Sequence, residues 1–435
     1  MSFGKGDLMF KNNKYNFTAI LLWMTYFCHG IQAIIISQNA DFFANKWGVE
    51  AAAVFAVIAW TGLGKISFLS FSGALSDKVG RKPLIVLGLM GYVIMFGSFL
   101  VATNIMMANI LAFIGGAMTS LYDGAINPAL FEMYPENKST ASIFSKAFIS
   151  VSSMLYPLFV AFLVSHKMSA EIGIILPFVL SILVLAGVLV ARFPDNDIRK
   201  EQKVSAREAI KILEAKQSTN QVTSVSSDTT KHQNAANFAV DGVVLSAFAF
   251  TIYSTFYLFQ QASKLYAQNV IHMSETGAAA VTSYYQLGGL VATIVFSVLM
   301  ARGIRDIALL VISPIFAGLA GLLVYFVPTA ATLTFAGIII GFFAAGGLLQ
   351  MGNAVLNQFF DKNKGRNTSI YYFVMALGSY IVPMLASKLI AANRADMIML
   401  FVSICGFASA ALMMFAGKRY GHIFGVSVFS NSKKG

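Results

Sequence analysis

The sequence has little charge for its length. Charged residues make up 11% of the 435 residues, apolar residues make up 57%, and the mean hydropathy is +0.70. A water-soluble fold of this size could not hide so much apolar surface in its core. The composition therefore disfavours a soluble protein and predicts a chain that crosses a membrane several times.

Cysteine and histidine are also scarce. Both cysteines, Cys28 and Cys405, lie in apolar segments, so no disulfide framework is expected. Only His29 of the five histidines falls in a predicted span, and the chain has no Glu-x-x-His pair and no Gly-x-x-x-x-Gly-Lys-Ser loop. We therefore expect no enzyme, no ATP-driven pump, no cofactor and no metal site. A signalling receptor would need an added domain, and neither the tail nor the central loop is long enough for one.

Apolar segments long enough to span the bilayer recur along the whole chain. Only helices or closed barrels satisfy their backbone in lipid, so each segment predicts a transmembrane helix. The first six are residues 16–40, 51–76, 83–102, 105–131, 140–165 and 171–193. The second six are residues 237–261, 276–301, 306–327, 330–357, 366–391 and 395–417. The predicted fold is an all-α membrane protein with twelve transmembrane helices in two pseudo-symmetric six-helix bundles. Its parts are the bundles 1–193 and 237–417, the central loop 194–236 and the tail 418–435.

Basic residues are distributed unevenly between the two sides of these spans. When the loops are assigned alternately, only Lys46, Lys167, Lys264 and Arg394 fall on the side away from the termini. The positive-inside rule then places both termini and the central loop in the cytoplasm. It also explains the net charge of +12 better than nucleic-acid binding does. No cleavable signal is expected at the N-terminus, because the first apolar run is too long.

The central loop has two kinds of sequence. EQKVSAREAIKILEAKQ predicts an amphipathic helix on the membrane surface, in contact with lipid, and STNQVTSVSSDTT predicts a linker.

The two halves of the sequence resemble each other at an offset of about 226 residues. NPALFEMYPENK at 127–138 aligns with NAVLNQFFDKNK at 353–364, and Pro157 aligns with Pro383. Such matches favour two bundles of similar shape. The two prolines predict helix kinks, which serve either ordinary packing or helices that rock around a shared cavity.

The stretch GALSDKVGRK, between the second and third spans, concentrates charge in this apolar chain. Gly73 permits close helix contact, Gly80 a tight turn, and Asp77 can pair with a cation, while Arg81 and Lys82 anchor the membrane face. The stretch resembles the signature loop of the major facilitator superfamily, and the twelve spans, central loop and internal repeat resemble that family over the whole chain. The resemblance implies that Asp77 and Arg81 latch the two bundles on the cytoplasmic side. The weaker copy, SVLMARGIRD at 297–306, has Ala301 in place of the aspartate.

Other elements depart from family patterns. The fourth span ends in a family-like Glu132-x-x-Pro135, but carries Asp123 where members often have an arginine. The fifth span lacks the Gly-Pro-x-x-Gly element of many drug–proton antiporters, which disfavours export. The first span has His29-Gly30-Ile31-Gln32 where aromatic-acid symporters carry two carboxylates. The general pattern still resembles uncharacterised bacterial carriers near the aromatic-acid or shikimate-type proton symporters.

Polar residues at membrane depth are the candidate substrate contacts, because an unpaired polar group there is costly. The family resemblance places the cavity between the bundles, lined mainly by spans 1, 4, 7 and 10. The candidates are Tyr26, His29, Gln32, Lys65, Asn127, Tyr253, Tyr257, Gln260, Gln261, Tyr284, Gln286, Asn353, Asn357, Tyr371 and Tyr372. For each tyrosine or glutamine taken singly, an ordinary contact between helices explains its presence as well as ligand binding does.

Lys65 and Asp123 are the charged residues of this set. They form either a structural ion pair or two separate functional groups, in which Lys65 meets an anionic solute and Asp123 or His29 carries a proton. We expect a monomeric secondary transporter of the bacterial cytoplasmic membrane that moves a small polar or carboxylate-bearing solute by alternating access, as a proton-coupled symporter. The alternative is proton-driven efflux of amphipathic drugs or metabolites.

Overall fold

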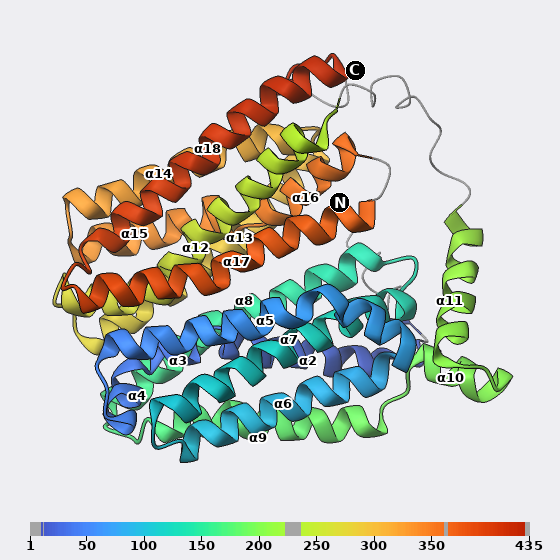
Figure 1. Cartoon of the computed structure of the whole chain (residues 1–435), viewed down its shortest axis with the longest axis horizontal. Coiled ribbons are helices and arrows are strands. Elements are labelled where there is room, and N and C mark those ends of the chain that lie inside the picture. The colour runs from blue at the N-terminus through green and yellow to red at the C-terminus, as the bar shows by residue number, and fades with distance from the viewer. Residues whose placement is uncertain (1–9, 12, 222–235, 361–363, 431–435) are drawn as a thin grey trace. The chain divides into compact units, whose positions relative to one another are not determined.

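The described part of the chain is helical. The computed structural model describes residues 10, 11, 13–221, 236–360 and 364–430, and these ranges contain no strand (Figure 1). Eleven helices in them are long and apolar enough to cross a membrane. The prediction of an all-α membrane protein is confirmed.

The spanning helices follow the predicted segments closely. In the first half they are α5 (Ala51–Val79), α6 (Arg81–Val101), α7 (Ile105–Met133), α8 (Lys138–Ser165) and α9 (Glu171–Val190). In the second half they are η3 with α12 (Phe238–Gly242, Val243–Asn269), α13 (Glu275–Ala301), α14 (Asp306–Phe326), α15 with η4 and α16 (Ala330–Ile340, Gly341–Ala345, Leu348–Phe359), α17 (Lys364–Ala391) and α18 (Met397–Phe424).

The first predicted span, 16–40, is interrupted instead of continuous. It forms α2 (Asn16–Gln32), the single turn α3 (Ile35–Gln38) and the start of α4 (Ala40–Trp47). The backbone leaves helical geometry at Ile34, with φ −126°, and again at Asn39, with φ −113°. The Asn39 amide donates to the Ile35 carbonyl oxygen and to the Tyr156 hydroxyl, both at 2.8 Å, so the second break is held in place.

The chain divides into two compact units. Unit 1 takes the described residues of Met1–Ala33, Leu63–Ser152 and Glu171–Ser226, and unit 2 takes those of Ile34–Gly62, Ser153–Ala170 and Ser227–Gly435. Unit 2 thus contains α3, α4 and the start of α5 together with all the spans of the second half. The predicted boundaries of the two six-helix bundles stay a prediction.

Within each unit the helices pack through small residues. In unit 1, α6 packs beside α7 and α9, and in unit 2, α18 packs beside α14 and α12 (Figure 1). A Cβ atom at Gly64 would collide with the Phe113 carbonyl, and one at Gly341 with the Tyr285 carbonyl. Glycine therefore lets these helix backbones approach closely. Large apolar side chains such as Met106, Leu183 and Ile294 are exposed.

The central loop forms two helices, α10 (Pro194–Gln202) and α11 (Ala206–Gln221). Ala206, Ala209 and Ile210 are buried, while Arg207 and Glu208 are exposed, so α11 is amphipathic as predicted. Most of the Ser/Thr-rich stretch lies outside the described residues.

Candidate functional site

A cluster of polar side chains lies inside unit 1, on α2, α6 and α7. Tyr26, His29 and Gln32 share one face of α2 because they are three residues apart. The rings of Tyr26 and His29 each meet the Tyr122 ring edge-on, with centroids 6.2 Å apart. The three-residue spacing in the sequence thus predicted correctly that these side chains share one face of α2.

Tyr92 of α6 is the centre of the cluster. Its hydroxyl lies 2.9 Å from His29 Nδ1, 3.0 Å from Thr119 Oγ1 and 2.5 Å from the Tyr122 hydroxyl. It also lies 3.4 Å from Gln32 Oε1. Sequence reasoning missed Tyr92 because the third span was not expected to line a cavity. Its signal was a single tyrosine in an otherwise apolar run.

Lys65 and Asp123 are in unit 1 as well, and both are half-buried. No ion pair joins them among the described residues, although Lys65 is near enough to act electrostatically on both Asp123 and His29. The Ser120 hydroxyl donates to the Lys65 carbonyl oxygen at 2.7 Å, which fixes α5 against α7 at this level. The charges are therefore coupled over a distance without neutralising each other by direct contact.

The polar candidates of unit 2 fall into separate groups. The rings of Tyr253 and Tyr257 stack at 4.8 Å. Thr368 donates to Asn353 Oδ1 at 3.0 Å and accepts from Asn357 Nδ2 at 3.1 Å.

The other candidates of unit 2 differ in exposure. Gln260 and Gln261 are buried, Gln286 is half-buried, and Tyr284 is exposed. The Tyr371 hydroxyl donates to the Leu349 carbonyl at 3.0 Å, and its ring meets that of Tyr372 at 5.4 Å.

The charged stretch predicted as a loop is the last turn of α5, the single residue Gly80 and the start of α6, and it forms a compact network around Arg81, which is 3% exposed. The guanidinium donates to Asp77 at 2.6 Å, to Ser76 at 2.8 Å and to Glu132 at 2.8 and 2.9 Å. The Arg81 amide donates to Asp195 of α10 at 3.0 Å. Gly80 takes φ +102°, a value that a residue with a side chain adopts only under strain. Lys82 donates to the carbonyls of Leu189 and Ala191, so it binds the end of α9.

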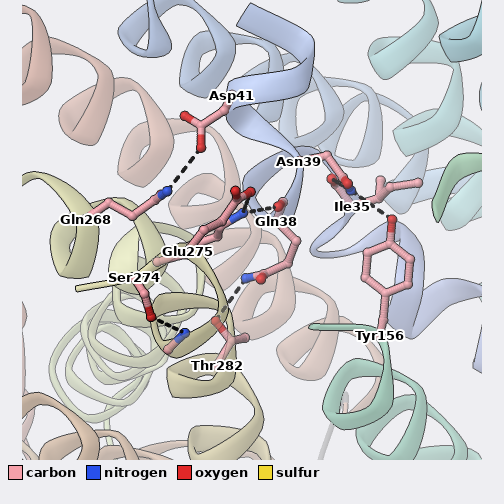
Figure 2. A network of polar contacts seen from close by, with 11 residues as sticks. Ile35, Gln38, Asn39, Asp41, Tyr156, Gln268, Ser274, Glu275 and Thr282 are labelled. Carbon is pink, nitrogen blue, oxygen red and sulfur yellow. Dashed lines mark hydrogen bonds and ion pairs between the residues drawn. The ribbon is translucent and has the colours of Figure 1, made fainter. Parts of the chain in front are cut away.

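A second polar network, inside unit 2, joins α3 and α4 to α12 and α13 (Figure 2). The Lys264 ammonium donates to the Gln38 carbonyl at 2.6 Å and lies 3.5 Å from Glu275. Gln38 Nε2 donates to Thr282 at 2.9 Å, and Gln268 donates to Asp41 at 3.1 Å. A cavity of about 40 Å³ beside Lys264 has room for a water molecule but not for an organic solute.

Sequence reasoning did not find this second network. Lys264 was placed in a loop, but α12 continues to Asn269 and buries Lys264 to 2% exposure. The signal was the combination of Asp41, Lys264 and Glu275 at the ends of spans on one side of the membrane. Among the described residues, no cluster of three His, Cys, Asp or Glu side chains could hold a metal ion.

The comparisons with known proteins agree with this architecture. The family model of the Major Facilitator Superfamily matches residues 22–262 and 242–423. Inner membrane transport protein YdiN of Escherichia coli (strain K12) is 29% identical over 370 residues, covering 85% of this chain and 82% of that protein. Inner membrane transport protein YdiM of the same organism is 28% identical over 415 residues, covering 94% and 95%. The crystal structure of a D-xylose-proton symporter has a TM-score of 0.70 at 14% identity, covering 94% of this chain and 99% of that chain, and so shares the fold.

These findings define a multi-pass membrane transporter, not an enzyme. The chain belongs to the Major Facilitator Superfamily.

Proposed function

We propose that this transporter is a proton-coupled symporter that moves a small polar or carboxylate-bearing solute by alternating access. The observation that carries the proposal is the arrangement in unit 1, where Lys65, Asp123 and His29 lie close together while Lys65 and Asp123 form no ion pair. A cation that is not bound to the nearby carboxylate can bind a solute carboxylate. The carboxylate and the imidazole then remain as sites for a proton.

Each side chain of the cluster has a proposed role. Lys65 binds the anionic group of the solute, and Tyr26 and Asn127 bind its hydroxyl or carbonyl groups. The Tyr26 hydroxyl is buried beside Asp123 and Asn127, so a polar ligand that enters there meets three polar groups at once. His29 and Asp123 carry the proton. In unit 2, the candidates are Tyr253, Tyr257, Gln260, Gln261, Tyr284, Gln286, Asn353, Asn357, Tyr371 and Tyr372.

The orientation and location follow from charge and from the relatives. Basic loops place the termini and the Asp77 loop in the cytoplasm. The two Escherichia coli relatives are described as inner membrane proteins, which favours the same membrane for this chain. We propose that the transporter acts as a monomer and that Asp77 and Arg81 belong to the cytoplasmic gating loop.

Uptake into proteoliposomes under an imposed pH gradient tests the proposal. We expect a labelled organic acid to accumulate when the interior is alkaline, and we expect Lys65→Met to abolish that accumulation. A thermal-shift screen of organic acids, sugars and drugs selects the solute, because a ligand of the folded state raises the thermal midpoint. Uptake that is unchanged when the gradient is collapsed would refute proton coupling.

Efflux of amphipathic compounds is the second candidate, and the stacked Tyr253 and Tyr257 rings favour it. Adjacent aromatic faces bind flat apolar compounds without requiring precise polar contacts. Overexpression should then lower the susceptibility of cells to such compounds, and the double variant Tyr253→Ala, Tyr257→Ala should remove the effect. An unchanged susceptibility profile excludes this function.

A further inference from the structure

The hydroxyl of Tyr92 has more hydrogen-bonding neighbours than it has protons. A phenol carries one proton and two lone pairs, so it can donate one hydrogen bond and accept two. Its three near neighbours are His29 Nδ1, Thr119 Oγ1 and the Tyr122 hydroxyl. Gln32 Oε1, at 3.4 Å, is too distant to compete for the proton. The direction of each bond can therefore be worked out by elimination.

Thr119 has already used its own proton. Its hydroxyl donates to the Gly115 carbonyl, one turn earlier in α7, at 2.8 Å. Toward Tyr92 the Thr119 oxygen can only accept. The contact of 3.0 Å is favourable only when Tyr92 donates its proton to Thr119.

The other two directions of donation leave one oxygen–oxygen contact without a proton. If Tyr92 donated to Tyr122, Thr119 Oγ1 would face the Tyr92 oxygen with no proton between them. The same conflict arises if Tyr92 donates to His29 Nδ1. When Tyr92 donates to Thr119, both remaining neighbours donate to Tyr92, and every contact holds one proton. Two hydroxyl oxygens 3.0 Å apart with no proton between them repel each other, so this arrangement is preferred.

We infer that Tyr92 and Thr119 hold neutral His29 as the Nδ1–H tautomer and so leave Nε2 as its basic nitrogen. The bonds then run from His29 Nδ1–H to Tyr92, from Tyr92 to Thr119, and from Thr119 to the Gly115 carbonyl. His29 is half-buried, and Nε2 has no protein partner in the part of the chain that the structure describes. Tyr92 and Thr119 are positioning residues, because they act through His29.

The consequence of this tautomer for transport rests on the proposed function, in which His29 carries a proton. A proton that arrives at Nε2 makes His29 a donor at both nitrogens, and the Nδ1–H bond to Tyr92 stays as it was. With the opposite tautomer, the new proton would land on Nδ1 and force Tyr92 to turn its own proton away. The observed network thus lets His29 gain and lose a proton without rearranging α6 or α7. The titratable groups facing His29 are Tyr26 on α2, Lys65 on α5, Tyr92 on α6 and Tyr122 on α7. Asp123 on α7 lies near Lys65 and Tyr26.

Nitrogen NMR of the full-length protein with ¹⁵N-labelled histidine tests the inference. The His29 signals are identified by their loss in His29→Gln, and the spectra are recorded at a pH where His29 is neutral. We expect a protonated-type signal from Nδ1 and a lone-pair-type signal from Nε2. Thr119→Val removes the acceptor while keeping the shape, so Tyr92 can then donate to His29 and an Nε2–H population should appear beside the Nδ1–H form.

Two control variants distinguish a change in hydrogen-bond direction at Tyr92 from a general disturbance of the cluster. Thr119→Ser keeps the acceptor and should keep the Nδ1–H tautomer. Tyr122→Phe removes a donor to Tyr92 but leaves the bond to Thr119, so it should also keep Nδ1–H. Nε2–H in the wild type, or no gain of Nε2–H signal in Thr119→Val, would overturn the inference.

The NMR result is independent of transport. If NMR shows the Nδ1–H tautomer but uptake does not depend on the pH gradient, the proposed function is refuted and the tautomer assignment is retained. If uptake is proton-coupled but NMR shows the Nε2–H tautomer, the tautomer assignment is refuted and the proposed function is retained.

Discussion

The Arg81 network of unit 1 and the Lys264 network of unit 2 both surround a buried cation, but they connect different parts of the chain. The side-chain partners of Arg81 are 4, 5 and 51 residues away, all in the first half of the sequence. Lys264 binds the carbonyl of a residue 226 positions away, and the neighbouring bond from Gln268 to Asp41 spans 227. The first network therefore stabilises one half, whereas the second joins a segment of the first half to helices of the second.

The two cations suit these different tasks. A guanidinium is planar and holds several oxygens in fixed directions, as Arg81 does with Asp77, Ser76 and Glu132. An ammonium is a point charge without directional preference, and Lys264 places it on the neutral Gln38 carbonyl at 2.6 Å, with the Glu275 carboxylate farther away at 3.5 Å. Separating Lys264 from Gln38 breaks a hydrogen bond, while separating Arg81 from Glu132 exposes two opposite charges. Opening the Arg81–Glu132 contact therefore costs more than opening the Lys264–Gln38 contact.

Arg81→Ala should have the largest effect on stability. It leaves Glu132, whose side chain is 6% exposed, without its cation, and loss of one partner of a buried ion pair costs about 3–5 kcal/mol. We expect a marked fall in the thermal midpoint of the purified protein in detergent. Lys78→Ala, at an exposed lysine of the same loop, is the control and should change little. A wild-type midpoint for Arg81→Ala would contradict a stabilising role of this network.

Lys264→Met should have an intermediate effect. It removes a charged hydrogen bond worth about 1.5–3 kcal/mol while keeping the side-chain volume. The attachment of α3 and α4 should loosen, so a cysteine at the exposed Asn45 position of α4 should react faster with a membrane-impermeant maleimide. Gln268→Ala, which removes a weaker bond of the same network, should accelerate labelling less. Equal labelling rates in the wild type, Lys264→Met and Gln268→Ala would argue against Lys264 as the residue that holds α3 and α4 to α12.

Asp77→Asn should change transport more than stability. The Asp77 side chain is 52% exposed, and exposed ion pairs contribute about 0–1 kcal/mol. We expect a near-normal thermal midpoint and reduced uptake, because the proposed latch needs the carboxylate. Asp306→Asn, at the end of the second-half copy of the loop, is the transport control. Full uptake by Asp77→Asn would remove this residue from the latch.

Lys14→Ala should have the smallest effect on the free energy of unfolding. Lys14 donates to Asp197 at 2.8 Å, and its side chain is 57% exposed. This hydrogen bond raises the pKa of Lys14 above its ordinary value. A raised lysine pKa adds stability that is complete below the ordinary pKa and is lost as the pH rises through the folded-state value. The difference from wild type should stay below about 1 kcal/mol and should be constant from about pH 6 to about pH 9. A difference that varies within this range would mean that another group titrates with Lys14.

The sequence identified features that depend on local spacing. Apolar length located the spans, Gly80 located the turn, and three-residue spacing placed Tyr26 and His29 on one face. What it missed depends on packing between distant segments. Nothing near Tyr92 shows that its hydroxyl meets α2 and α7, and nothing near Lys264 shows that α12 continues past it. The interruption at Ile34 has no glycine or proline to mark it.

The oxygen that Lys264 holds belongs to the main chain of Gln38, and every amino acid supplies that oxygen. It is available because α3 ends at Gln38 and the last carbonyls of a helix lack amide partners within it. The contact with Lys264 therefore does not depend on the side chain at position 38, which makes its own hydrogen bond to Thr282. It does depend on the side chain at position 264. A search for pairs of positions that change together would overlook the Lys264–Gln38 contact, because Gln38 contributes a main-chain oxygen and only Lys264 contributes a side chain.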